Sequence, residues 1–327
     1  MRAPTRPGLD NLDKLILREV CQGSVERLVW PDFRLSSRAI GRKLGAPSGT
    51  VRDRLSKWSK SGFLKSPALW LNPNIFGLHL GMLALDASPT IPKAELVKKL
   101  MMVEDVTVIV THAGNFVGVA FYYANDRSLE RKIGLISALC GAKDSKFTET
   151  PYPQCSLKLT RTDWRVIASL GKDVTRPYAT IARELNLSAR TVKRRVSNLV
   201  GGGAITAVAS TNIAALTNEI FADLVVEYGD SNVRGDVDRN LLLILDPYLY
   251  FAGPGVNYSL FVLNLPNIKS STDIAERVGR LRGVKSARME IMEERIELYG
   301  ALLSHVEEKL GQDQMTVQVK NSKFAKP

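Results

Sequence analysis

The chain contains two copies of one pattern, and this internal repeat is the feature that most limits how it can fold. A shift of 141 residues places Arg38–Leu64 on Ala179–Ile205 without a gap. At an offset of 150, Asp13–Ile16 falls on Asp163–Val166. The first copy therefore carries about nine extra residues, which we assign to a loop at Ser24–Leu35. We interpret the chain as a tandem duplication.

Each copy has the apolar spacing of three helices followed by a short strand. In the second copy the first helix is predicted to begin at Thr162 or Asp163. The turn Asn186–Ser188 separates a short second helix from a basic third helix, Ala189–Val200, and Ser188 is a good N-cap. Ala204–Ser210 is predicted to form a β-wing. This order is typical of a winged helix-turn-helix, whose last helix enters the DNA major groove.

The positive charge of the chain is concentrated in these two copies. The net charge is +12, and the basic residues alternate with neutral or acidic blocks along the chain. Residues 1–70 hold 14 Lys/Arg and 6 Asp/Glu, and residues 157–212 hold 10 and 3. Residues 71–156 hold 8 and 8, and residues 213–312 hold 10 and 15. Such a balance favours a polyanionic partner for the two basic blocks.

A solvated basic three-helix bundle is the plainer alternative for these blocks. Two features that recur in both copies favour DNA binding instead. A small residue, Gly41 or Ala182, lies in the second helix, where it lets helices cross closely, and the third helix is basic in both copies.

Two segments carry a resemblance to a known family. SSRAIGRKLGAPSGTVRDRLSKWSKSGFL, from Ser36, and YATIARELNLSARTVKRRVSNLVGGGAI, from Tyr178, resemble the DNA-binding signature of the Lrp/AsnC (feast/famine) transcription regulators. The first copy departs from that signature at Ala46–Gly49. The resemblance implies a winged helix-turn-helix followed by a βαββαβ ligand-sensing domain, here in two copies.

The DNA contacts are expected on the third helices. The candidate DNA-binding residues are Ser48, Arg52, Arg54, Lys57, Arg190, Thr191, Lys193, Arg194 and Arg195. A helical wheel turns Arg190 and Arg194 outward in the second copy but Gly49 and Asp53 in the first. Asp53 would repel phosphates unless it accepts from cytosine or is neutralised by Arg54 or Lys57. The two DNA-binding units are therefore expected to be unequal, and the second to supply more affinity.

The blocks between the basic units have the order βαββαβ, that of a ferredoxin-like domain. In the first block the expected strands are Leu80–Asp86, Val106–Thr111, Val117–Tyr123 and Lys146–Thr150, and the helices Thr90–Met101 and Asp126–Leu139. The second block is a looser copy, with strands at Ile220–Tyr228, Tyr248–Ala252, Tyr258–Leu265 and Val284–Ile291. A last helix is expected at about Arg295–Leu310.

The predicted fold class is thus α+β, with two winged helix-turn-helix domains alternating with two ferredoxin-like domains. The expected boundaries are 1–70 and 157–212 for the DNA-binding domains, 71–156 and 213–312 for the sensing domains, and 313–327 for a basic tail. Because one chain holds two sensing domains, we expect them to pair within the chain at high effective concentration. The last helix could also support further association of chains.

The resemblance implies an amino-acid effector beside a glycine-containing turn between two strands. Carried over, the candidate effector-binding residues are Thr111, Gly114 and Asn115, or Gly253, Gly255 and Asn257. The plainer alternative is that these glycines only form hairpin turns.

No motif of a common enzyme class or metal site stands out. The histidines His79, His112 and His305 lie far apart, and His79 and His112 are expected to be packed or turn residues. Gly201–Gly203 lacks the Lys-Ser/Thr of a phosphate-binding loop. We therefore expect no catalytic residue, no cofactor and no metal. Three cysteines at wide spacing and the lack of a long apolar run or secretory leader suggest a cytoplasmic protein.

The sequence-specific transcription regulator is our leading interpretation, with double-stranded DNA as partner. Two alternatives stay open. Siroheme decarboxylases share the two-domain architecture, and two unlike halves could mimic their heterodimer, although that chemistry gives no reason for such basic third helices. A nucleoid-organising protein would share the charge pattern but bind DNA without sequence preference.

Overall fold

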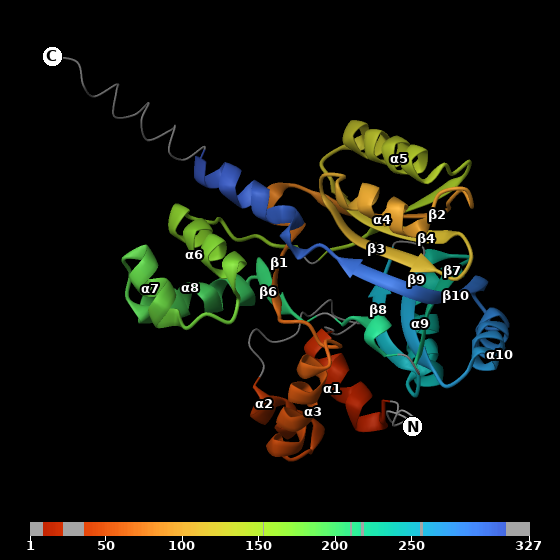
Figure 1. Cartoon of the computed structure of the whole chain (residues 1–327), viewed down its shortest axis with the longest axis horizontal. Coiled ribbons are helices and arrows are strands. Elements are labelled where there is room, and N and C mark those ends of the chain that lie inside the picture. The colour runs from red at the N-terminus through yellow and green to blue at the C-terminus, as the bar shows by residue number, and fades with distance from the viewer. Residues whose placement is uncertain are drawn as a thin grey trace, which may run out of the picture.

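The computed structural model describes residues 9–21, 36–152, 154–209, 211–216, 219–255 and 258–311. The expected loop at Ser24–Leu35, the basic tail and Asn257 lie outside the described residues. The fold is α+β, as predicted: two groups of three helices lie beside a large antiparallel sheet that carries further helices (Figure 1).

The first group of helices, which we call head 1, comprises α1 (Asn11–Cys21), α2 (Ser37–Leu44) and α3 (Ser48–Lys60). Ser36 caps α2 by accepting a hydrogen bond from Ala39 N, and α2 ends at Gly45 with a positive φ of 65°. Gly41 is required where α2 meets the next turn, because a Cβ there would lie 2.6 Å from the carbonyl oxygen of Ala46. The prediction of a small residue for close helix crossing is confirmed here.

Head 2 comprises α6 (Arg161–Lys172), α7 (Tyr178–Leu185) and α8 (Ala189–Gly201). The predicted cap of the third helix is confirmed, since the Ser188 hydroxyl accepts from Thr191 N. The turn before it uses Asn186 with φ 56°, a conformation that asparagine tolerates better than most residues. The first helix starts slightly earlier than expected, because Thr160 and Asp163 form a capping box.

The two heads are joined by a two-stranded ribbon, which is not the separate wing expected in each. Strand β1 (Ala68–Leu71) follows head 1 and pairs antiparallel with β6 (Ile205–Val208), which follows head 2. Each head supplies only one strand here, and pairing satisfies the backbone groups that both would otherwise expose. The side chain of Asn72 adds a hydrogen bond of 2.8 Å to the carbonyl of Gly203.

The rest of the chain forms one sheet of eight strands, in the order β5-β2-β4-β3-β10-β7-β9-β8. Its first half holds β2 (His79–Asp86), α4 (Lys93–Met101), β3 (Val106–His112), β4 (Phe116–Tyr123), α5 (Asp126–Cys140) and β5 (Ser145–Thr150). Its second half holds β7 (Ile220–Tyr228), α9 (Arg234–Leu245), β8 (Leu249–Pro254), β9 (Tyr258–Leu265), α10 (Ile268–Gly279) and β10 (Val284–Glu297). Both halves have the predicted βαββαβ order, and β3–β10 pairing joins them.

The sheet curves so that its two halves face each other. Thr150 on β5 contacts Tyr258 on β9, with 3.1 Å between the hydroxyl oxygens, although five strands separate β5 from β9 in the sheet. Lys146 on β5 also pairs with Glu227 on β7. The four helices α4, α5, α9 and α10 contribute to separate apolar cores, one in each half. On the other face of the sheet, Val108, Phe221 and Val262 belong to an apolar core that includes head 1.

The C-terminal helix begins later than predicted. Strand β10 continues to Glu297, and a short 3-10 turn at Tyr299–Leu302 precedes helical residues 303–311. Arg295 lies within the sheet opposite Val110, because β10 pairs with β3 as far as Glu297. The predicted start of the last helix at Arg295 is therefore wrong.

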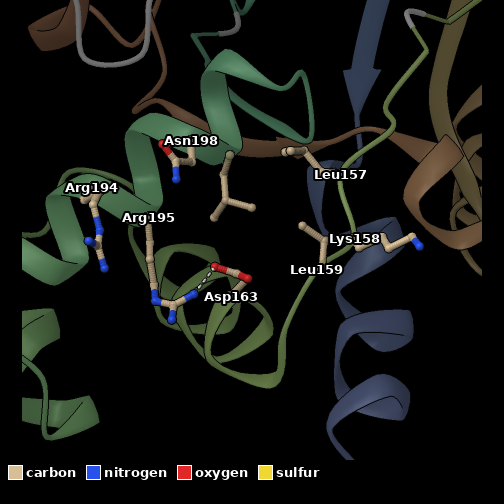
Figure 2. Close-up of a pocket in the computed structure, with 8 residues that line it drawn as sticks. Leu157, Lys158, Leu159, Asp163, Arg194, Arg195 and Asn198 are labelled. Atoms are coloured by element: carbon tan, nitrogen blue, oxygen red, sulfur yellow. Dashed lines mark hydrogen bonds and ion pairs between the residues drawn. The ribbon is translucent and has the colours of Figure 1, made fainter.

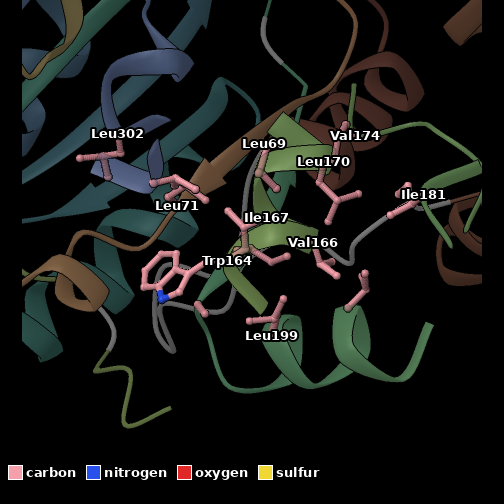
Figure 3. Packing of buried hydrophobic residues seen from close by; sticks show 14 of the residues in the cluster. Leu69, Leu71, Trp164, Val166, Ile167, Leu170, Val174, Ile181, Leu199 and Leu302 are labelled. Atoms are coloured by element: carbon pink, nitrogen blue, oxygen red, sulfur yellow. The ribbon is translucent and has the colours of Figure 1, made fainter. Parts of the chain in front are cut away.

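Each head shares its apolar core with segments that are distant in the sequence. Leu69 and Leu71 of β1 and Leu302 pack with Trp164 and Ile167 of head 2 (Figure 3). Gly171 on α6 allows a close approach, because a Cβ there would lie 2.7 Å from Leu303 Cδ2. Head 1 in turn packs with residues of β3, β7 and β9. The four units are thus interlocked.

Candidate nucleic-acid interface

Helix α8 presents a basic outer face. Val192, Val196 and Leu199 are buried on its inner face, whereas Arg190, Lys193 and Arg194 are exposed. None of these three cations forms an ion pair with a described residue. Arg190 and Arg194 lie one helical turn apart, so both can reach one stretch of a polyanion.

Two other candidate residues on α8 have internal partners. Thr191 is half-buried, and its hydroxyl lies 2.9 Å from that of Ser188. Arg195 donates to Asp163 Oδ1 at 2.7 Å and to Thr160 Oγ1 at 3.2 Å. Burial alone would raise the pKa of Asp163, but hydrogen bonds from Thr160 and Arg195 outweigh it and lower the pKa below its usual value.

A surface pocket of about 220 Å³ lies between α8 and the segment before α6 (Figure 2). It is lined by Leu157, Lys158, Leu159, Asp163, Arg194, Arg195, Asn198 and Leu199. The Arg195–Asp163 ion pair forms part of its wall. Lys158 also lines the pocket, and its side chain points away from α8 (Figure 2).

Helix α3 of head 1 presents a mixed outer face. Arg52 and Asp53 have side chains 73% and 76% exposed, and Arg52 Nε lies 3.5 Å from Asp53 Oδ1. The described partner of Asp53 is therefore Arg52, and not Arg54 or Lys57, which were considered from the sequence. Ser48 and Lys57 are exposed. This face offers less net positive charge than α8 does.

Arg54 has the same surroundings in head 1 as Arg195 in head 2. Its Nη1 atom lies 2.6 Å from Asp10 Oδ1 and also contacts Asp13. Hydrogen bonds to Asp10 and Asp13 raise the pKa of Arg54 above its usual value, and those from Arg54 and the backbone lower that of Asp10. Asp10, Asp13, Thr160 and Asp163 were not predicted as site residues, although the match of Asp13 to Asp163 was a signal.

The first candidate effector turn is open at its tip. Gly114 has a φ of 82°, and no atom lies within 4 Å of the position of a Cβ there. Gly114 and Asn115 are exposed, whereas Thr111 is 3% exposed within β3. The structure thus brings Gly114 and Asn115 together at the surface and places Thr111 inside the sheet.

The second candidate turn is filled by the chain itself. A Cβ on Gly255 would lie 1.8 Å from the ring of Tyr258, and Arg234 donates to the Gly255 carbonyl. Gly253 lies in β8, where it pairs with Leu260. This arrangement leaves no room for a ligand against Gly255.

Each of the three histidines has an acidic partner. His112, expected to be a packed residue, is 1% exposed, and its Nε2 lies 2.9 Å from Asp223 Oδ2 across the two sheet halves. His112 Nδ1 and Asp223 Oδ1 are buried without a hydrogen-bond partner. His79 is half exposed and lies 3.3 Å from Glu149, and His305 Nε2 lies 2.8 Å from Asp105.

No described group of three or more His, Cys, Asp or Glu side chains could hold a metal ion. Among the described residues, the helices are also too short or too polar to span a bilayer.

The comparisons with known proteins agree with the helical geometry of head 2. Residues 159–200 match the AsnC-type helix-turn-helix domain, a range that covers most of α6 to α8. An uncharacterised helix-turn-helix-type transcriptional regulator of Pyrococcus horikoshii is 31% identical over 102 residues, which cover 31% of this chain and 58% of the relative. The chain thus spans less than two thirds of the length of that curated relative. The transcriptional regulator LysM of Sulfurisphaera tokodaii is 26% identical over 40% of this chain and 91% of its own.

A solved structure matches the whole arrangement. The siroheme decarboxylase NirDL, crystallised with an iron-uroporphyrin III analogue, aligns with a TM-score of 0.56 over 93% of this chain and 99% of its own. The two chains are 14% identical. At this identity the likeness shows a shared fold and leaves the activity of this chain open.

Proposed function

We propose that this protein is a sequence-specific DNA-binding transcription regulator of the Lrp/AsnC type. The observation that carries the proposal is the exposed, unpaired cationic face of α8, formed by Arg190, Lys193 and Arg194, on a helix-turn-helix that matches the AsnC type. Guanidinium groups bind phosphates and guanine edges in the major groove, which is where the third helix of such a unit lies. The proposed place of action is therefore the cytoplasm, where a prokaryotic regulator meets its genome.

Selection of bound genomic fragments by the full chain tests this function. An enriched sequence, bound much more tightly than random DNA at the same salt concentration, is the expected result. Equal affinity for both would instead favour a nucleoid-organising protein. The matched variant Arg194→Ala should lose most of the preference, because it removes an exposed cation and leaves the Arg195–Asp163 ion pair in place.

The chain is proposed to be a tandem duplication, in which units 1–70 and 157–212 bind DNA and units 71–156 and 213–312 pair with each other. Three observations support this. The heads have the same helix order, the two halves of the sheet have the same βαββαβ order, and β3–β10 pairing joins the halves within one chain. Light scattering of the dilute protein should then give the mass of a single chain, and a larger mass would mean that chains associate further.

An amino-acid effector is proposed to bind beside Gly114 and Asn115. The openness of this turn supports the choice, as does the contact of Tyr258 with Gly255 in the other. A calorimetric screen of the free amino acids tests it. Binding that Asn115→Ala abolishes is expected, and binding that is insensitive to Asn115→Ala would contradict the proposal.

The second candidate function is decarboxylation of a tetrapyrrole. It is favoured by the match of the whole fold to a siroheme decarboxylase and by His112, whose buried Nδ1 lacks a hydrogen-bond partner. Loss of CO2 from a carboxylate leaves an electron pair on carbon that must take up a proton, and a protonated imidazole ring can donate one. A shift in the absorbance of added iron-uroporphyrin III that His112→Ala abolishes would support this candidate. An unchanged spectrum with the wild-type protein would exclude it.

A further inference from the structure

We infer that Arg195 and Arg54 are positioning residues that lock the third helix of each head to the start of the first helix, and that they do not contact DNA phosphates. The inference deepens the proposed function and rests on it. It divides the basic residues of α8 and α3 into those that face outward and those that hold the helix in place.

In head 2 this lock consists of the Asp163 carboxylate, the backbone N–H of Thr160 and the guanidinium of Arg195. Asp163 Oδ2 accepts from Thr160 N at 2.8 Å and thereby caps α6, while Asp163 Oδ1 accepts from Arg195 at 2.7 Å. The Asp163 side chain is 13% exposed and that of Arg195 is 27% exposed. One carboxylate therefore satisfies the start of α6 and fixes a side chain from the middle of α8.

Head 1 contains the same lock with a different capping residue. Asp13 and Asp10 cap α1 by accepting from each other's backbone N–H groups, and Arg54 binds both carboxylates. The Arg54 side chain is 26% exposed, close to the value for Arg195. The outward residues of the two heads differ, but this contact is the same in both. Because the same contact occurs in both heads although their outer faces differ, we assign it to holding the shared arrangement of helices.

Arg194 provides the contrast within one helix. It is exposed and forms no ion pair with the described residues, whereas its neighbour Arg195 points back toward α6. Arg195 Nε is also buried beneath the surface and has no hydrogen-bond partner, so this atom faces protein and not an approaching duplex. A guanidinium already compensated by a carboxylate displaces few counterions when DNA binds.

The test is a salt titration of DNA binding by the full chain, on its selected sequence and on random DNA. Arg194→Ala should reduce the slope of log K against log salt by about 0.9 if it removes one phosphate contact. Arg195→Ala should leave this slope unchanged, weaken binding at every salt concentration, and lower the ratio of specific to random affinity, because the helix is no longer held in register. Loss of stability alone would not change that ratio in the folded protein.

Asp163→Asn provides the second arm of the test, because it removes the partner and keeps Arg195. It should lower the ratio of specific to random affinity as Arg195→Ala does, and in this ratio the double variant should add little to either, as expected for two residues of one contact. A slope that falls as much for Arg195→Ala as for Arg194→Ala would overturn the inference, and so would additive effects in the double variant. Wild-type protein that binds no DNA would refute the proposed function itself, a different result from either.

Discussion

Heads 1 and 2 share a scaffold and differ in the face that they present. Both have a capped first helix locked by an arginine of the third helix, through Arg54 in one and Arg195 in the other. On the outer face, however, α8 presents Arg190 and Arg194, while α3 presents Gly49 and the Arg52–Asp53 pair. The comparison teaches that two heads with the same internal contacts can present different outer surfaces.

The largest effect is expected from Arg194→Ala. One well-placed Arg–base contact contributes about 1–3 kcal/mol, so affinity for the preferred DNA should fall roughly 5- to 150-fold. The change Arg52→Ala, at an exposed arginine of head 1, should cost much less, because Arg52 is already paired with Asp53. Fluorescence anisotropy with labelled duplex measures both. Equal losses, on a palindromic preferred site, would show that the heads are equivalent.

The second helices offer a test of the shared scaffold. Gly41→Ala would place a methyl group 2.6 Å from a backbone oxygen, and such overpacking costs about 1–3 kcal/mol. The opposite change at the matching position, Ala182→Gly, should cost about 1 kcal/mol through lower helix propensity. Denaturant unfolding followed by circular dichroism measures both. A neutral Gly41→Ala would mean that α2 and the turn after it can separate at no cost.

Low pH should lower the stability of head 2, because protonation of Glu184 breaks its ion pairs with Lys172 and Arg176. Hydrogen bonds from Lys172 and then Arg176 lower the pKa of Glu184 to about 2. A carboxylate with a depressed pKa stabilises the fold above its usual pKa of 4.5, and that contribution is lost as the pH falls toward 2. The matching residue of head 1 is Lys43, which pairs with Glu19 instead.

The measurement is the thermal unfolding midpoint between pH 5 and pH 2, with Glu184→Gln as the comparison. The wild-type protein should lose more stability across this range than the variant does. The difference should be modest, because the carboxylate lies at the surface, where water screens the ion pairs. If the unfolding midpoints of the two proteins fall in parallel with pH, Glu184 does not have the lowered pKa assigned to it.

The smallest effect is expected from Asp53→Ala. Asp53 is 76% exposed and repels phosphate, so its removal should leave specific affinity nearly unchanged and tighten binding to random DNA slightly. Filter binding at low salt, where charge effects are largest, measures this. A large loss of specific affinity would instead show that Asp53 accepts a hydrogen bond from a base and that head 1 reads sequence.

Local features of the fold were predictable from the sequence, and pairings between distant segments were not. Ser188 as a cap and Asn186 in the turn follow from nearest-neighbour chemistry, and β7 and β9 have their expected bounds. The β1–β6 ribbon could not be predicted, because the sequences of two short strands do not indicate which strand each will pair with. The ion pairs of Arg54 and Arg195 within the heads could not be foreseen either, because the sequence of a basic helix does not reveal which side chains turn inward.

The interlocked sheet has a consequence for any attempt to divide this protein. A fragment that ends before residue 157 would expose the edge of β3 that β10 covers and leave β1 without β6. It would also lack Ile213, Phe221 and Met292, which complete the core of head 1. Such fragments should aggregate, or exchange strands with a second fragment, because open sheet edges recruit partners. The two halves of the chain therefore fold as one unit, and a destabilising substitution in either half should lower the stability of both.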